Sequence, residues 1–213
     1  PFLFESSFAP GAPYENVWKC PDAVVVDWEG GEITDAGLRL SSRSQAMKQS
    51  LGVPPFALCS VKLKVETSHT SYREDFFQAL SNARWGHSGD LVIATPVEDT
   101  QLAEELRQLG SEFGLGVITY GISYEALDDL PAHYDIPSMR PREFEAVQGL
   151  FHRQRLAAAS PRRMEWRRIE QVRRNNPEFE SLFQWLERSL QDGVAHTWQK
   201  YLPLDRRTET EHP

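Results

Sequence analysis

Short apolar runs alternate with amphipathic segments along the first part of the chain. Residues 23–26 form a β-branched run, and residues 56–65 alternate apolar and polar positions behind two prolines; both segments predict strands. Residues 91–94 are short and wholly apolar, which is typical of a strand buried on both faces, and residues 117–120 predict another buried strand. The pattern therefore predicts four strands before residue 125.

Two segments between these strands have the spacing of amphipathic helices. Their apolar positions are Tyr72, Phe76, Phe77, Leu80 and Trp85 in the first segment and Leu102, Leu106, Leu109 and Phe113 in the second. Ser71 and Glu74 match a capping box at the start of the first helix, which Gly89 is expected to stop. Asp99 or Thr100 is expected to cap the second helix.

The order strand, strand, helix, strand, helix, strand predicts an α/β protein. Its short apolar strands favour a mixed central sheet, with parallel members, that helices flank. Residues 37–49 are polar and are expected to form a loop or a short helix. Residues 142–159, 164–174 and 179–191 predict a C-terminal helical extension, with Pro177 near the first turn of its last helix.

The C-terminal third is locally basic, although the whole chain has a net charge of −8. Between Arg140 and Arg174 there are ten arginines and four glutamates, a net +6 that leaves −14 for the rest. Such a segment is either a solvated helical face or a surface for nucleic-acid phosphate, and composition leaves both open. The candidate DNA-binding residues are Arg162, Arg163, Arg167 and Arg168.

The composition bounds the class of protein. A chain of 213 residues with 40% hydrophobic and 25% charged residues is typical of a globular protein. No apolar run reaches the roughly 18–20 residues that span a bilayer, so we expect no membrane partner. Cys20 and Cys59 have no C-x-x-C partner, which excludes a metal knuckle and favours a reducing, cytoplasmic location. Because the chain opens with Pro1, we expect that the natural N-terminus has been removed.

Two segments carry candidate chemistry. Pro21-Asp22 comes directly before the first strand, and Lys62 and Lys64 share one face of the second strand because side chains alternate. Metal-dependent nucleases use carboxylates to hold Mg²⁺ and a lysine to orient the attacking water. Each signal also has a structural explanation, since Pro-Asp is common in turns and paired lysines are common on exposed strand edges.

The second of these segments and the helix after it resemble a known family. Residues 61–64 and 72–85 are similar to the restriction-associated HrgA-like proteins of the PD-(D/E)XK nuclease superfamily. That family reads F-E-L-K followed by R-E-x-F-F-Q-A-x-S-N-S-x-W. Segments that continue the match in order are residues 89–94, 113–118 and 176–179. The resemblance covers most of the chain from Trp18 onward and is poor over residues 123–163.

The resemblance implies a role for each candidate site residue. Asp22 would be the first ligand of Mg²⁺, and the backbone carbonyl of Leu63 would be another. Lys64 would be the catalytic lysine, and Gln78 would lie against the phosphate or the metal. The family places a glutamate where this chain has Lys62, and an ammonium group cannot ligate Mg²⁺.

Three explanations of Lys62 remain open. In the first explanation, another carboxylate takes the place of the missing glutamate in the metal site, either Glu66 on the same strand face or Glu15 before the first strand. Alternatively, the protein is a degenerate nuclease that binds nucleic acid without cutting it. In the third explanation Lys62 is an engineered charge reversal, or the alignment is shifted by one step.

The resemblance implies a restriction-endonuclease-like core over residues 14–125 and a basic helical extension over 136–204, with irregular termini at 1–13 and 205–213. The expected function is a Mg²⁺-dependent endodeoxyribonuclease of a restriction or defence system, acting on double-stranded DNA, with a homodimer if both strands are cut symmetrically. The alternative is a catalytically degenerate DNA-binding module of a larger restriction or regulatory protein. A protein-interaction domain, which the acidity of the chain favours, is a third possibility.

Overall fold

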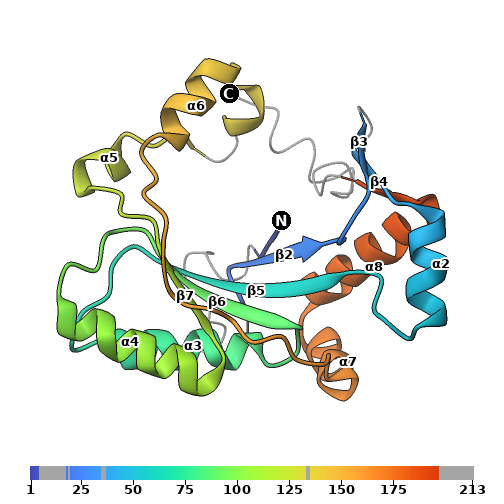
Figure 1. Ribbon diagram of the computed structural model, residues 1–213, viewed down its shortest axis with the longest axis horizontal. Coiled ribbons are helices and arrows are strands. Elements are labelled where there is room, and N and C mark those ends of the chain that lie inside the picture. Colours follow the sequence, from blue (N-terminus) through green and yellow to red (C-terminus); the bar gives the residue numbers. More distant parts are fainter. Residues whose placement is uncertain (5–17, 19, 35–36, 133–134, 197–213) are drawn as a thin grey trace. The chain divides into compact units, whose positions relative to one another are not determined.

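The protein is an α/β protein with a mixed central sheet flanked by helices, as the sequence pattern predicts. A computed structural model describes residues 1–4, 18, 20–34, 37–132 and 135–196 (Figure 1). Within these residues the sheet has the strand order β1-β2-β5-β6-β7-β8, and a second sheet has the order β3-β4-β9. The described chain divides into two compact units, and strand β5 (Ala57–Lys64) runs from the first into the second.

The first unit comprises Pro1–Ser60, Trp85–His87 and the described residues from Arg163 onward. Its elements besides the start of β5 are β1 (Phe2–Leu3), β2 (Ala23–Asp27), β3 (Glu32–Thr34), β4 (Gly37–Arg39), α2 (Ser42–Ser50), α7 (Trp166–Asn175), α8 (Pro177–Asp192) and β9 (Val194–Ala195). Strands β3 and β4 form an antiparallel pair that β9 extends. The short helix expected within residues 37–49 is confirmed as α2, whereas residues 37–39 form a strand that was not predicted, because β3 and the distant β9 supply pairing partners.

An aromatic cluster forms the core of the first unit. The ring centroid of Phe179 lies 4.8 Å from that of Phe4 and 5.1 Å from that of Trp85, and all three side chains are buried. Helix α8 begins as predicted, with Pro177 in its first turn and the Asn176 side chain accepting a hydrogen bond from the backbone of Glu178. Helix α8 thus packs its apolar stripe against Phe4 and Trp85 of the same unit.

His87 makes the free energy of unfolding of this unit depend on pH. Its Nδ1 accepts a hydrogen bond from the backbone N–H of Leu58 at 3.0 Å, and its buried Nε2 has no hydrogen-bond partner among the described residues. Burial lowers the pKa of His87 below the usual 6.5, and the charge of Glu29 opposes this effect only in part. The unfolded chain consequently binds more protons than the folded chain once the pH falls below about 6.5.

We therefore expect the unfolding free energy to decrease as the pH is lowered from about 6.5 toward the folded-state pKa of His87. Urea unfolding at a series of pH values between 7.5 and 5 measures this slope, with those pH limits set on the order of one unit either side of the usual histidine pKa. The His87→Gln variant cannot titrate, and its amide oxygen can still accept from Leu58. An identical pH slope in both proteins would contradict the prediction.

The second unit comprises Val61–Arg84 and Ser88–Arg162. Its elements besides the end of β5 are α3 (Tyr72–Ala83), β6 (Ser88–Ile93), α4 (Thr100–Phe113), β7 (Gly116–Thr119), α5 (Tyr124–Asp128), the 3-10 helix η2 (Ile136–Ser138), α6 (Pro141–Gln148) and β8 (Gln154–Ala157). Strands β6 and β7 are parallel, with Leu91 opposite Val117, and β8 is antiparallel to β7. The predicted helix over residues 142–159 was wrong in its second half, because residues 154–157 pair with β7.

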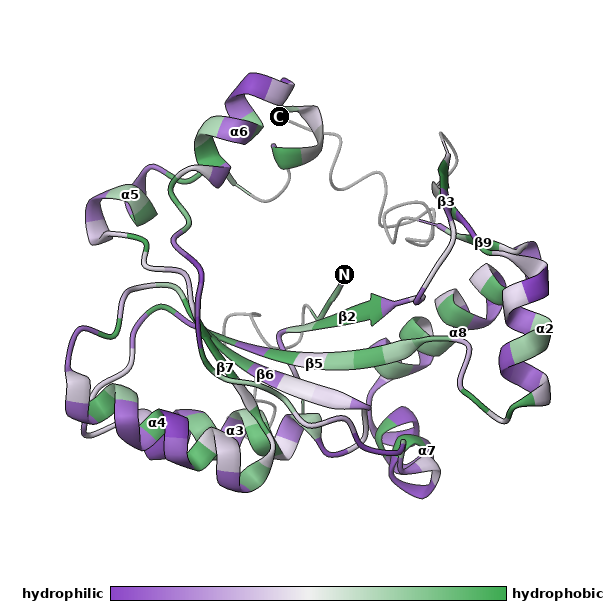
Figure 2. Ribbon diagram, in the orientation of Figure 1, coloured by the Kyte–Doolittle hydropathy of each residue, from purple (hydrophilic) through white to green (hydrophobic). Residues whose placement is uncertain are grey.

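Helices α3 and α4 lie side by side against the strands of this unit (Figure 1). Figure 2 shows β7 as hydrophobic, whereas α3 and α4 alternate hydrophobic and hydrophilic residues as amphipathic helices do. Leu91, Leu106 and Val117 are fully buried at this interface. The predicted N-cap of α4 is confirmed for Asp99, whose side chain accepts from the N–H of Leu102 at 2.9 Å, and the left-handed Gly114 ends the helix.

Two local predictions about α3 were wrong. Ser71 makes no side-chain capping bond to the helix; its hydroxyl instead accepts from the backbone N–H of Ser68 at 3.1 Å. Gly89 does not stop the helix, which ends at Ala83, but lies inside β6. A Cβ atom at Gly89 would lie 2.2 Å from the Cβ of Ala83, so close packing requires glycine there.

Candidate functional site

Strand β5 of the second unit presents two lysines on one face. It is continuous from Ala57 to Lys64, so Lys62 and Lys64 share a face as predicted. Lys62 is only 5% exposed, Lys64 is half-buried, and Leu63 between them is 42% exposed on the opposite face. Lys62 is therefore not part of a solvated strand edge, and Lys64 is only partly open to water.

Helix α3 supplies the groups that hold Lys64. The Lys64 Nζ atom lies 2.7 Å from Asp75 Oδ1 and donates a hydrogen bond of 3.0 Å to Gln78 Oε1. The second carboxylate oxygen of Asp75 accepts from the Thr67 hydroxyl at 2.9 Å, and Gln78 Nε2 donates to Glu74 at 2.9 Å. The structure thus brings together two predicted site residues, Lys64 and Gln78.

Asp75 is the member of this cluster that the sequence analysis missed. It stands in the first turn of α3, where an acidic residue is ordinarily interpreted as a partner of the helix dipole. The side chain of Asp75 is 8% exposed, and that of Lys64 is 25% exposed. A charge pair shielded to this extent interacts more strongly than a pair on the surface.

Glu66, the predicted migrated carboxylate, belongs to a different contact. It is exposed two residues beyond the end of β5 and accepts a hydrogen bond from the hydroxyl of Tyr124 on α5. This bond raises the pKa of Tyr124 above its usual range. Glu66 makes no ion pair with Lys64 among the described residues. The other proposed substitute, Glu15, lies outside the described residues.

Asp22 belongs to the first unit, directly before β2. It is 3% exposed, and its backbone carbonyl accepts from the N–H of Phe4 at 3.1 Å. Lys62, Lys64 and Gln78 belong to the second unit. The convergence of Asp22 with Lys64 stays a prediction.

The donor set around Lys64 does not fit a magnesium ion. Magnesium binds carboxylate and carbonyl oxygens, and it requires ligands that are free to coordinate. Both carboxylate oxygens of Asp75 are engaged, one by Lys64 and the other by Thr67. Within the part of the chain that the structure describes, no group of three His, Cys, Asp or Glu side chains is placed to hold a metal.

Helix α7 of the first unit and the segment before it carry a second candidate site, which we call the α7 basic face: Arg167, Arg168 and Arg174 on the helix, and Arg163 before it. Arg163, Arg167 and Arg174 are exposed, and Arg168 is half-buried. None of the four side chains makes an ion pair with a described residue. Ile169, which is fully buried, anchors the opposite side of the helix.

Two nearby arginines do not belong to the α7 basic face. Arg173 pairs with Glu170 at 3.2 Å and with Glu180 at 2.7 Å, and the Glu180 contact is the main cause of its raised pKa. Arg162 belongs to the second unit, is half-buried and is not free, so it does not join the exposed cations as the sequence analysis predicted.

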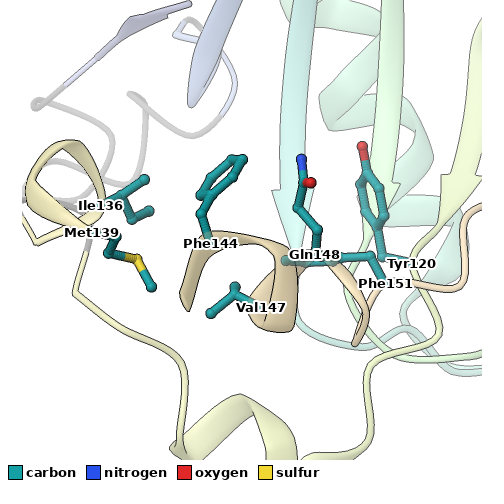
Figure 3. A pocket seen from close by; sticks show the side chains of 7 residues that line it. All are labelled: Tyr120, Ile136, Met139, Phe144, Val147, Gln148 and Phe151. Carbon is teal, nitrogen blue, oxygen red and sulfur yellow. The ribbon is translucent and has the colours of Figure 1, made fainter. Parts of the chain in front are cut away.

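A hollow of about 540 Å³ lies beside α6 in the second unit (Figure 3). Its lining residues are Tyr120, Ile136, Met139, Phe144, Val147, Gln148 and Phe151. The Tyr120 and Phe151 rings pack edge to face with centroids 5.5 Å apart. Among the described residues that line this hollow there is no carboxylate, amine or imidazole.

Comparisons with known proteins yielded no relative: no family model, no curated protein and no solved structure matches this chain. The resemblance to HrgA-like proteins therefore stays a prediction. No helix within the described ranges has both the length and the apolar character needed to cross a membrane.

Proposed function

We propose that this chain is a DNA-binding protein with a restriction-endonuclease-like core that does not cleave, and that the α7 basic face contacts the phosphate backbone. The observation that carries this proposal is the set of exposed arginines on α7 that have no ion-pair partner among the described residues. A link to restriction or defence is supported by the family resemblance alone.

Three exposed arginines elsewhere in the chain are neutralised locally, whereas others, such as Arg84 and Arg142, are exposed and also have no ion pair with a described residue. Arg107 pairs with Glu104, Arg140 with Glu143 and Arg188 with Asp192, each one helical turn away. The arginines of the α7 basic face also lack such partners, and they are crowded on and directly before one short helix, where like charges repel. A polyanion removes that repulsion and gains free energy from the release of its counterions. The geometry of α7 is thus suited to phosphate.

Positions 167 and 174 are the outermost cations of α7. They are seven residues apart, which is close to two helical turns, so both project from the same side of the helix. Gln171 lies between them on that side and is exposed. Two arginines about 10 Å apart along the axis can reach two phosphates of one strand.

The Arg167→Ala/Arg174→Ala variant tests this proposal. We expect its DNA affinity to fall and the slope of log affinity against log salt to become shallower by about 2, because two phosphate contacts are lost. Fluorescence anisotropy titrations at several salt concentrations measure both quantities. The matched control is Arg107→Ala/Arg188→Ala, which removes the same charge from exposed, paired positions. Equal slopes for the two variants would overturn the proposal.

A non-cleaving core is supported by the state of the candidate catalytic residues. Lys62 stands where the family pattern has glutamate, and Lys64 is neutralised by Asp75 instead of being free to activate water. We expect plasmid DNA incubated with the protein and Mg²⁺ to remain intact.

Phosphodiester hydrolysis is the second candidate function, and one observation favours it. An amine, a carboxylate and an amide are clustered at Lys64, Asp75 and Gln78, so Asp75 could be the migrated carboxylate. Cleavage that requires a divalent metal and is abolished in both Lys64→Ala and Asp75→Ala would establish this function instead. If Lys62 is an inactivating change, cleavage should appear only in Lys62→Glu.

A further inference from the structure

Trp166 is an exposed aromatic residue within the basic part of α7. It is 63% exposed at the first position of the helix and is followed directly by Arg167. The packing of α7 does not use it, because Ile169 is the buried residue of this helix and Val172 packs beside it. The Trp166 ring makes no aromatic or cation–π contact with a described residue. An indole of this size exposed among cations is typical of a binding surface.

A hollow of about 430 Å³ lies beside Trp166, between α7 and α8 of the same unit. Phe56, Phe183 and Leu186 give it an apolar interior. Its polar lining consists of the amide groups of Gln184 and Gln191, the carboxylates of Glu180 and Glu187, and Arg173. The guanidinium of Arg173 lies 5.6 Å from the ring centroid of Phe183 and is itself held by Glu180, so this wall of the hollow is restrained. The hollow therefore combines flat aromatic surfaces with hydrogen-bonding edges.

These features match the chemistry of a nucleobase. A base has two apolar π faces, which stack on aromatic side chains, and polar edges, which amide groups can recognise. The adjacent Arg163 and Arg167 are exposed, without ion-pair partners among the described residues, and available for the phosphates on either side of that base. We propose that Trp166 and the hollow between α7 and α8 bind one unstacked base, so that the protein prefers single-stranded or bulged DNA to perfect duplex.

This inference rests on the proposed function, because the phosphate contacts of the α7 basic face place the base. In a perfect duplex both faces of every base are covered by its neighbours, and extruding one base costs several times the thermal energy. A base that is already unpaired carries no such cost. The aromatic site should therefore contribute to the binding affinity for single-stranded and bulged DNA only. The arginines should contribute to the affinity for single-stranded, bulged and perfect duplex DNA alike.

The test compares the Trp166→Ala and Trp166→Phe variants on a single strand, a perfect duplex and the same duplex with one bulged base. For Trp166→Ala we expect about 5- to 150-fold weaker binding of the single strand and the bulge, and unchanged binding of the duplex. Trp166→Phe should keep most of the affinity, since a smaller ring still stacks. Phe144→Ala, an exposed aromatic position of the other unit, is the matched control and should change nothing.

A fluorescent base analogue at the bulge reports on stacking directly. Its emission should be quenched when the unaltered protein binds, and not when Trp166→Ala binds at saturating concentration. Equal weakening of all three DNAs, or no change in any of them, would overturn the base site. If the Arg167→Ala/Arg174→Ala variant still lowers the salt slope in that case, the phosphate-binding function stands without the base site. If that variant also leaves the slope unchanged, both proposals fail.

Discussion

Phe179→Ala is expected to lower the free energy of unfolding by about 3–5 kcal/mol, the largest effect of any single substitution proposed for this protein. Phe179 is 1% exposed and packs between the rings of Phe4 and Trp85. Alanine would remove most of the buried ring and leave a cavity that two large neighbouring rings cannot easily collapse to fill. Urea unfolding followed by tryptophan fluorescence and by circular dichroism measures the loss.

Ile33→Ala serves as the control for Phe179→Ala. Ile33 is 89% exposed, so its truncation should change the unfolding free energy by less than about 0.5 kcal/mol. A loss below about 1 kcal/mol for Phe179→Ala would show that the aromatic cluster is not packed as described. That outcome would also remove the anchor of α8, and with it the support for the hollow beside Trp166.

Lys64→Met should lower the free energy of unfolding by about 3 kcal/mol, because the Asp75 carboxylate would remain buried with the Thr67 hydroxyl as its remaining side-chain partner. Asp75→Asn should cost less, since the 25% exposed Lys64 can reach water. The double variant should recover part of the loss, giving a coupling energy of about 1–3 kcal/mol. Urea unfolding of the four proteins completes this double-mutant cycle.

The exposed pair Arg107–Glu104 on α4 provides the matched cycle. It has the same charges and belongs to the same unit, but both side chains are about half exposed. Its coupling energy should lie within about 0.5 kcal/mol of zero. Equal coupling in the two cycles would mean that Lys64 and Asp75 are solvated, and the case against a water-activating role for Lys64 would then be lost.

The main α/β elements could be predicted from the sequence because their signals are local. Strand β7 is mostly apolar and fully buried, and α4 repeats leucine at helical spacing, so the sequence pattern and the observed burial agree. The end signals of α4 are equally local: an aspartate that accepts from the backbone N–H three residues later, and a glycine in a left-handed conformation. Elements of this kind can be predicted from their own residues, without knowing which other elements they pack against.

The strands that the sequence analysis missed are short and depend on distant partners. Residues 154–157 contain glutamine, arginine, leucine and alanine, all of which favour helices in isolation. They form β8 because β7 offers a buried edge with which they pair. Strand β4 likewise forms between β3 and β9, which lies about 155 residues further along the chain. Pairing across such separations leaves no periodic signal in the sequence.

The features of the candidate sites also fall into those that the sequence determines and those that depend on tertiary contacts. The sequence by itself determined that Lys62 and Lys64 share a face, because strand geometry alternates side chains, and that arginines accumulate near α7. Only the tertiary structure decided that Asp75 neutralises Lys64, that Glu66 bonds Tyr124 instead, and which arginines are left without partners. The physical reason is that the energetic effect of a charged side chain depends on its burial and on its ion-pair partners. Both are set by contacts between helices and strands that are distant in the sequence, so the order of residues alone does not reveal them.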